Sequence, residues 1–143
     1  MKRRKLLQSL PAISLVPTAA WAALQSKADP ASTTVYELRV YHTYEGKLGD
    51  LLKRFRDYTM KLFEKHGIKN VAYWTPLEEP AKSNTLIYIL AHASREAAAA
   101  NWKAFQDDPE WKSVRDKSEE NGKIVEKVDS TYMVLTDFSP SVR

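Results

Sequence analysis

The apolar residues of the first folded stretch change their spacing part-way along it, and this change restricts the fold more than any other feature. Residues 35–42, with the sequence VYELRVYH, alternate at period two, as expected for a β-strand with one strongly apolar face. From Gly46 to Gly67 the apolar side chains recur three and four residues apart, which is the stripe of an amphipathic helix. The sequence therefore predicts a strand followed by a helix that ends near His66, with Gly67 in the C-cap turn.

The remaining elements follow from the same two periods and from the residues that begin and end helices. Ser94 and Asp108 are suitable N-caps, and Pro109 stands in a first helical turn, where proline is tolerated. The predicted strands cover residues 69–75, 85–93 and 130–138, and the predicted helices cover residues 95–106 and 109–121.

The predicted order is strand, helix, strand, strand, a helical pair and strand. A β-α-β-β-α-β order is typical of ferredoxin-like α+β domains, in which helices cover one face of an antiparallel sheet. The opposite face also carries apolar residues on several predicted strands, and a soluble monomer rarely exposes so large an apolar area. We therefore expect the sheets of two copies to pair in a two-fold homodimer.

Residues 1–22 have the composition of an export signal. The charged start MKRRK precedes the apolar stretch LLQSLPAISLVPTAA, and small residues end the segment at Ala22, where we expect cleavage. The apolar stretch is too short and too polar to insert stably in a membrane. The mature protein is therefore expected in the periplasm or outside a bacterial cell, with residues 23–34 as a disordered lead-in to one domain over residues 35–140.

The route of export has two interpretations. Arg3 and Arg4, followed by Leu7, resemble the twin-arginine signal that exports folded proteins, whereas Lys2 and Leu6 depart from its usual residues. Export by the folded route and export by the unfolded route both remain open at this point.

Composition excludes several classes of function. The formal charge of +4 comes from the first five residues, because residues 23–143 contain 18 basic and 18 acidic side chains. A neutral domain offers no basic field to a phosphate backbone, so a nucleic-acid partner is not expected. The chain has no cysteine, which excludes disulfides, thiolate metal sites and a cysteine nucleophile.

Four stretches together resemble the NIPSNAP family of the dimeric α/β-barrel superfamily. They are YELRVY, FEKHGIKNVAYW, AAANWKAFQDDPEWK and STYMVLTDFSP, and they extend in order over residues 35–140. The resemblance implies a ferredoxin-like subunit that pairs sheet to sheet with a second copy. The superfamily includes cofactor-free monooxygenases, small-ring isomerases and haem-binding enzymes, but NIPSNAP-like proteins have no generally assigned reaction. Enzymatic activity would therefore rest on analogy between folds alone.

His66 is the candidate catalytic residue, because its place in the helical stripe directs it inward beside the sheet, as a general base requires. The favoured alternative is that His66 caps the helix C-terminus, where a cation is stabilised. The spacing of His42, His66 and His92 matches no metal-binding signature, so no metal site is expected. Haem on a helix-borne histidine is an alternative, but no pair of basic residues is placed for its propionates, and no cofactor is predicted.

Arg39 has two interpretations: it clamps an anionic substrate, or it forms a structural ion pair with Glu37 or a cross-strand acid, which we favour. Most aromatic residues are expected to pack the core or the dimer contact. Where the second helical pair faces the central strand, some could line a pocket for a flat apolar ligand. The candidate pocket residues are His66, Tyr88, Trp102, Arg39 and Trp74.

Two functions remain. The first is an exported homodimeric domain that binds a small apolar or aromatic molecule between helices and sheet, with any catalysis in the manner of the superfamily. The second is a protein-interaction module without catalytic activity. A cavity of about 300 Å³ or more with convergent polar groups favours the first function, and a filled core favours the second.

Overall fold

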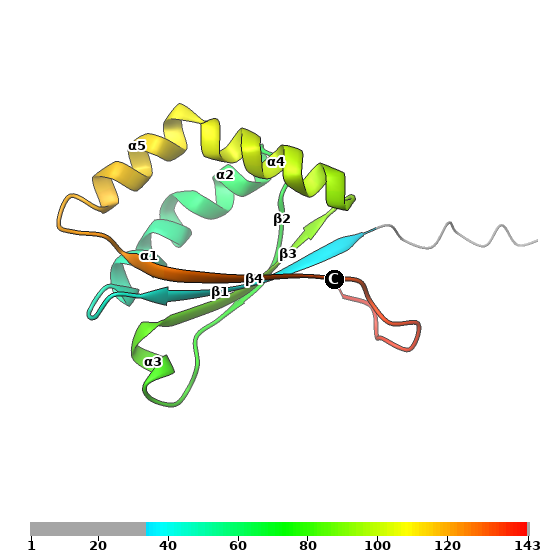
Figure 1. Ribbon diagram of the computed structural model, residues 1–143, viewed down its shortest axis with the longest axis horizontal. Coiled ribbons are helices and arrows are strands. Elements are labelled where there is room, and N and C mark those ends of the chain that lie inside the picture. The colour runs from blue at the N-terminus through cyan, green and yellow to red at the C-terminus, as the bar shows by residue number, and fades with distance from the viewer. Residues whose placement is uncertain (1–33, 143) are drawn as a thin grey trace, which may run out of the picture. The chain divides into compact units, whose positions relative to one another are not determined.

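The computed structural model describes residues 34–142, which form one compact unit of helices and strands (Figure 1). The predicted export signal and almost all of the predicted lead-in lie outside the described residues. Within residues 34–142, no helix combines the length and apolar character needed to cross a membrane. In chain order the elements are β1 (Val35–Thr43), α1 (Leu48–Arg54), the π-helix η1 (Phe55–Thr59), α2 (Met60–Lys65), β2 (Lys69–Trp74), α3 (Ala81–Asn84), β3 (Thr85–His92), α4 (Arg95–Asp107), α5 (Pro109–Ser118) and β4 (Val125–Met133).

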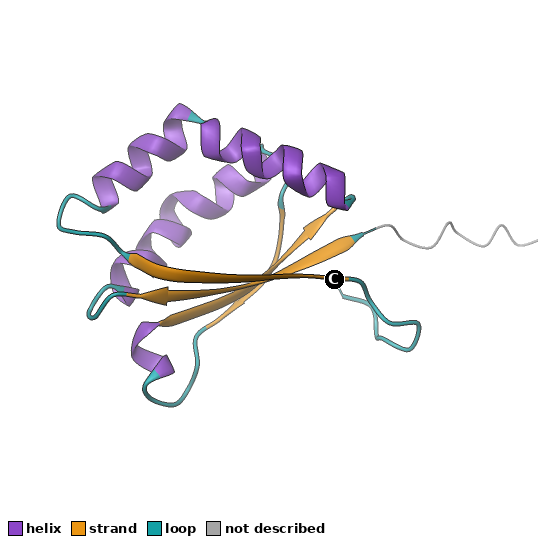
Figure 2. Ribbon diagram, in the orientation of Figure 1, coloured by secondary structure: helices purple, strands orange, loops and turns teal. Residues whose placement is uncertain are grey.

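The four strands form one antiparallel sheet in the order β2-β3-β1-β4 (Figure 2). This order, with the two central strands β3 and β1 flanked by β2 and β4, is the ferredoxin-like arrangement. Figure 1 shows α1, α2, α4 and α5 on the same side of the sheet. The predicted α+β fold, a split β-α-β-β-α-β sandwich with helices on one face, is therefore confirmed.

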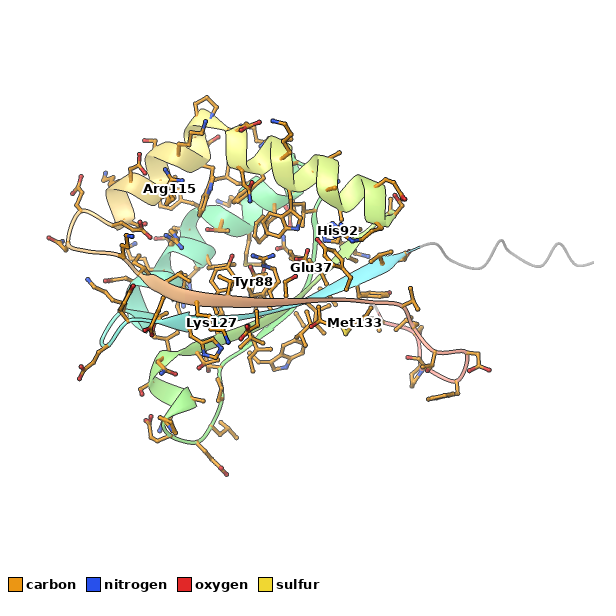
Figure 3. All side chains as sticks on the ribbon, viewed as in Figure 1. Glu37, Tyr88, His92, Arg115, Lys127 and Met133 are labelled. Atoms are coloured by element: carbon orange, nitrogen blue, oxygen red, sulfur yellow. The ribbon has the colours of Figure 1, made fainter. Side chains whose placement is uncertain are left out.

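The alternation of β1 separates a helix-facing side from an outer side. Glu37 and Arg39 contact Trp102 of α4, so they lie on the helix side. Leu38 and its neighbours of the same parity therefore lie on the outer side, and the register places Met133 there as the partner of Tyr36. Figure 3 shows Glu37, Tyr88 and His92 on the helix side and Met133 on the opposite side.

Aromatic rings fill much of the space between the sheet and the first helical segment. Tyr88 is fully buried at the centre of β3, and its ring centroid lies 5.1 Å from those of Phe55 and Tyr73 and 5.3 Å from that of Tyr41. Phe63 continues the cluster at 6.3 Å from Tyr88. Such offset and edge contacts add to the free energy gained by burial. Residues beside Tyr88 thus form a filled core.

The long first helix contains a π-helical turn that the apolar spacing did not predict. Residues Phe55–Thr59 adopt this wider turn, and the buried Thr59 donates its hydroxyl to the carbonyl of Arg54 at 3.2 Å. A threonine hydroxyl that bonds a carbonyl in the preceding turn competes with the regular helical ladder. The apolar stripe nevertheless stays on the sheet side, because Phe55, Leu62 and Phe63 are all buried.

Two predicted boundaries and one predicted loop were wrong. The last strand covers Val125–Met133 and not residues 130–138. It pairs only with β1 and is largely exposed, so its sequence lacks the strong alternation that marks a half-buried strand. Helix α5 ends at Ser118, before the predicted end at Gly122. A short helix, α3, lies in the stretch between β2 and β3, which was predicted to be a loop.

Candidate functional site

A buried carboxylate on β1 organises the polar side chains between the sheet and α4. Glu37 is 0% exposed. One carboxylate oxygen, Oε1, accepts hydrogen bonds from Arg39 Nη1 at 2.7 Å and Ser130 Oγ at 2.8 Å. The other, Oε2, accepts from Trp102 Nε1 at 2.7 Å and bonds His92 Nε2 at 2.9 Å. Side chains from β1, β3, β4 and α4 therefore meet at one carboxylate; Figure 3 shows Glu37 and His92 of this group on the helix side of the sheet.

The hydrogen bonds determine the charge of Glu37. Burial raises its pKa, but the bonds from His92, Trp102, Arg39 and Ser130 outweigh burial and lower the pKa to about 2. The carboxylate is therefore ionised at neutral pH and can only accept hydrogen bonds. It follows that Nε2 of His92 carries the proton in the bond to Glu37.

Arg39 lies beside this carboxylate and uses all three guanidinium nitrogens within the protein. Besides the bond to Glu37, its Nε donates to the Tyr88 hydroxyl at 3.0 Å and its Nη2 to the Tyr41 hydroxyl at 3.3 Å. The guanidinium carbon lies 4.4 Å from the ring centroid of Trp102. Burial alone would lower the pKa of Arg39, but Tyr41, Tyr88 and the Glu37 bond raise it. Arg39 is thus a fixed cation in an ion pair with Glu37, the arrangement that we favoured from the sequence.

His92 is the unsatisfied member of the group. Its side chain is fully buried and Glu37 holds its Nε2, but its Nδ1 is buried without a hydrogen-bond partner among residues 34–142. The Tyr132 ring lies 6.2 Å from the His92 ring, and the Arg95 guanidinium lies 3.7 Å from the Tyr132 centroid. Arg95 is exposed and Tyr132 is half-buried, so Tyr132 lies between His92 and the surface. A buried polar atom without a partner is rare in folded proteins and requires an explanation.

The structure brings three of the five predicted pocket residues together. Tyr88 and Trp102 both contact the Arg39 guanidinium, one through its hydroxyl and the other through its ring face. Trp74 is 48% exposed and pairs with Ile87, which places it on the outer side of the sheet. His66 lies apart from Arg39 in a different hydrogen-bonded group.

His66 connects two helices. Its Nε2 lies 2.6 Å from a carboxylate oxygen of Asp108, which also accepts from Lys65 Nζ at 2.8 Å. Asp108 is the N-cap of α5 and accepts from the Glu110 backbone N–H at 2.8 Å, as predicted for this residue. The Lys65 and His66 bonds hold the pKa of Asp108 well below its usual range. The His66 side chain therefore bonds the N-cap carboxylate of α5, while its backbone N–H bonds carbonyls of its own helix.

Sequence reasoning missed the site that Glu37 and His92 form. Glu37 was considered only as an ion-pair partner, and His92 only as a metal ligand. The antiparallel register pairs Glu37 with Leu90, two residues before His92, so both side chains lie on one face. The ferredoxin-like strand order would have placed these two ionisable side chains together, because it makes β1 and β3 neighbours. The separation of 55 residues hides the pair in the sequence itself.

Comparison with known families identifies the domain. A NIPSNAP family model matches residues 36–140, almost the whole described region. The chain belongs to the NIPSNAP family. An uncharacterized NIPSNAP-like domain protein from Burkholderia xenovorans has 14% identity and a TM-score of 0.67, over 78% of this chain and 93% of that one. A NIPSNAP family protein with unknown function from Agrobacterium tumefaciens has 24% identity and a TM-score of 0.64, over 76% and 94% of the two chains.

The fold of this NIPSNAP domain extends to a wider group. SnoaB, a cofactor-independent oxygenase from Streptomyces nogalater, has 11% identity and a TM-score of 0.51, over 76% of this chain and 99% of that one. At this identity the similarity concerns the fold alone. A search of curated proteins finds no match.

In this NIPSNAP domain, His92 and Glu37 are the kind of imidazole–carboxylate pair that can take part in acid–base chemistry. An imidazole fixed through one nitrogen by a carboxylate can accept a proton or a hydrogen bond at the other nitrogen. The three histidines contact three separate carboxylates, those of Asp129, Asp108 and Glu37. Within residues 34–142, no three side chains are grouped as metal ligands would be.

Proposed function

We propose that this NIPSNAP protein is a homodimeric domain that binds a small aromatic or largely apolar molecule carrying a hydroxyl or amine donor. The ligand donates a hydrogen bond to Nδ1 of His92. The observation that carries this proposal is the orphaned Nδ1, which is buried beside a carboxylate whose own hydrogen bonds are satisfied. A ligand donor would supply the missing bond, and leaving such an atom unpaired costs about 1–3 kcal/mol.

The surroundings of His92 favour an aromatic ligand. Trp102 and His92 bond the same oxygen of Glu37, so the indole lies next to the imidazole. The ring of Tyr132 also lies near the imidazole, 6.2 Å from that of His92. Two aromatic rings around one polar acceptor are the usual composition of a small-molecule site. Tyr132 belongs to the edge strand β4, and Arg95 stacks on its ring, so we expect a ligand to enter by displacing these two side chains.

The proposed ligand class is testable with a matched pair of probes. Para-fluorophenol carries the donor, and para-fluoroanisole has the same ring without it. We expect the phenol to bind the protein about 5-fold more tightly than the anisole, as measured by fluorine NMR, because one hydrogen bond contributes about 1 kcal/mol. His92→Leu should abolish this preference, whereas His66→Leu should preserve it. Equal binding of both probes to the unaltered protein would refute the proposal.

The apolar residues on the outer side of the sheet support the proposed homodimer. Leu38, Val40, Ile87 and Ile89 lie there and are only partly covered by the chain itself. The segment after β4 adds Leu135, which is 44% exposed and lines a shallow hollow together with Ile89. An apolar area that extends over several strands and this segment favours a second copy as its cover. The outer sheet faces of two copies would then form the dimer.

The assembly is measured directly by sedimentation velocity. Ile89→Glu places a charge at the centre of the outer side, and we expect it to convert a dimer to a monomer. Ala100→Glu adds the same charge to an exposed position of α4 and serves as the control. A monomeric unaltered protein, or a dimer that Ile89→Glu leaves intact, would reject this interface.

The alternative function is a protein-interaction module without catalysis. The filled aromatic core around Tyr88 favours it, because the predicted pocket bordered by His66, Tyr88 and Trp102 is occupied there by side chains. A dimer that binds neither fluorinated probe would support this alternative.

Export remains a proposal based on residues 1–22. The basic start, the apolar stretch and the small residues before Ala23 support a cleaved signal and a periplasmic or extracellular location. Mass spectrometry of the protein recovered from the periplasm of its host should give an N-terminus at Ala23. A cytoplasmic protein that retains Met1–Ala22 would contradict this proposal.

A further inference from the structure

A second site lies in the helical layer, away from His92. Helix α1 and the π-helix η1 form one wall of a cleft of about 500 Å³, and helix α5 forms the other. Asp50, Lys53, Arg54 and Tyr58 line the first wall, and Val114 and Lys117 line the second. The volume is within the range of small-molecule pockets.

The cleft contains an arginine that is buried and only partly satisfied. Arg54 is 5% exposed. Its Nη1 donates to Ser118 Oγ at 3.2 Å and lies 3.5 Å from the Glu119 carboxylate, and its guanidinium lies 5.2 Å from the Trp111 centroid. Its Nε is buried and has no hydrogen-bond partner in the part of the chain that the structure describes.

The charge of Arg54 is incompletely neutralised. Glu119 is its nearest carboxylate, and 3.5 Å is longer than the 2.7–2.9 Å of a good charge-assisted hydrogen bond. Burial lowers the pKa of Arg54, and Glu119 opposes this effect only in part. An anion bound beside the guanidinium would neutralise its charge, and bound close to Nε it would satisfy that donor.

Lys117 supplies a second cation to the cleft. Its side chain has no ion-pair partner among residues 34–142. The other charged groups of the walls are already paired, Lys53 with Asp57 and Asp50 with Lys47. The unpaired charge in the cleft is therefore positive.

The backbone next to Arg54 is also unusual. The π-helix begins at the next residue, and the Thr59 hydroxyl bonds the Arg54 carbonyl. Single π-helical turns within α-helices occur frequently at functional sites. Tyr58, in the same turn, is half-exposed and lines the cleft with Val114 opposite. These two side chains offer apolar surface beside the two cations.

We propose that the cleft between α1–η1 and α5 binds a small organic anion, a carboxylate or a phosphate, with the anionic oxygens on Arg54 and Lys117. The apolar part of the ligand packs against Tyr58 and Val114. This site is separate from the one at His92 and uses none of its side chains. Its ligand is anionic, whereas the ligand proposed for His92 is a hydrogen-bond donor.

The test uses benzoate, its neutral isostere benzamide and inorganic phosphate. We expect benzoate to shift the Nε–H resonance of Arg54 in proton–nitrogen NMR spectra of the whole protein, and benzamide to leave it unchanged. Phosphate distinguishes the two sources of anion: binding as tight as that of benzoate assigns the site to a phosphate group, and weaker binding assigns it to an organic carboxylate. Equal binding of benzamide, or a stationary Arg54 resonance with benzoate, overturns the proposal.

Variants separate binding from folding. Lys117→Ala removes an exposed, unpaired cation and should weaken benzoate about 3-fold without altering the melting temperature. Lys112→Ala removes an exposed cation of α5 that does not line the cleft and should leave benzoate affinity unchanged. Arg54→Met should weaken benzoate about 30-fold or more, provided that its spectrum shows a folded protein. If Lys117→Ala and Lys112→Ala weaken benzoate binding equally, the loss comes from the net charge of the protein and the proposed site is rejected.

Discussion

The Glu37 carboxylate and the His92 imidazole form a hydrogen bond of 2.9 Å, and both side chains are fully buried between the sheet and α4. This contact joins the two central strands of the sheet through their side chains. It fixes one nitrogen of the imidazole and leaves the other without a partner. The stability of the domain and its proposed ligand site therefore depend on the same carboxylate.

Acid should weaken the domain through Glu37. Its pKa is lowered from 4.5 to about 2 in the folded protein. A lowered folded-state pKa means that ionised Glu37 stabilises the fold above about pH 4.5 and that this contribution disappears as the pH falls toward 2. The shift corresponds to about 3 kcal/mol. Urea unfolding at a series of pH values should show that the free energy of unfolding of Glu37→Gln depends less on pH than that of the unaltered protein.

The exposed Glu120 provides the control for this experiment. Glu120→Gln should keep the pH dependence of the unaltered protein. If the curves for Glu37→Gln and Glu120→Gln are parallel between pH 2 and 5, the hydrogen bonds to Glu37 do not stabilise its charged form.

Removing the hydroxyl of Tyr88 should destabilise the core. In Tyr88→Phe, Nε of the part-buried Arg39 loses its acceptor at 3.0 Å, and we expect a loss of about 1–3 kcal/mol in the free energy of unfolding. Tyr58→Phe removes the hydroxyl of a half-exposed tyrosine and should cost little. Chemical unfolding of both variants measures these two changes in the free energy of unfolding. Equal small losses would mean that Arg39 finds another acceptor.

His66 should matter for stability and not for the ligand at His92. His66→Ala removes a hydrogen bond to a charged acceptor between two helices, and we expect the free energy of unfolding to fall by about 1 kcal/mol. The affinity for para-fluorophenol should stay the same. A folded His66→Ala protein that no longer binds the phenol would make His66 part of the ligand site.

Two glycines should respond to alanine in opposite directions. Gly67 has a φ of 73°, and a Cβ there would lie 3.0 Å from Asn101 Nδ2, so Gly67→Ala should cost about 1–2 kcal/mol. Gly49 lies within α1 with no atom near its added Cβ, so Gly49→Ala should stabilise the fold by about 0.5–1 kcal/mol. Thermal melting compares the two variants. If Gly49→Ala destabilises the protein, the expectation that an alanine side chain fits there without a clash is wrong.

The sequence predicts the fold well where burial imposes a period. The alternation of residues 35–42, the stripe that ends near His66 and the N-cap at Asp108 each reflect a local cause, so the predicted order of the four strands and the longer helices is correct. The last strand was predicted too far along the chain, because β4 is an exposed edge strand with little apolar alternation to detect. The π-turn was missed because Thr59 continues the apolar spacing while its hydroxyl changes the backbone hydrogen bonds.

The candidate site was less accessible to sequence analysis. The grouping of Arg39, Tyr88 and Trp102 is local to one face and was partly predicted from alternation. The contact of Glu37 with His92 depends on the register of β1 against β3, which no single strand records. The helical position of His66 shows that it points inward but not that Asp108 lies beside it. The spacing of apolar residues shows which face of a helix or strand is buried, whereas a site depends on which of these faces pack against each other.

Nitrogen NMR of the His92 ring tests the central claim most directly. We predict a proton on Nε2, where the ring bonds Glu37, and none on Nδ1. The Nδ1 resonance should then move on addition of para-fluorophenol and stay in place with para-fluoroanisole. A proton on Nδ1 with a bare Nε2, or an Nδ1 resonance that the phenol leaves unchanged, would contradict the proposed role of His92.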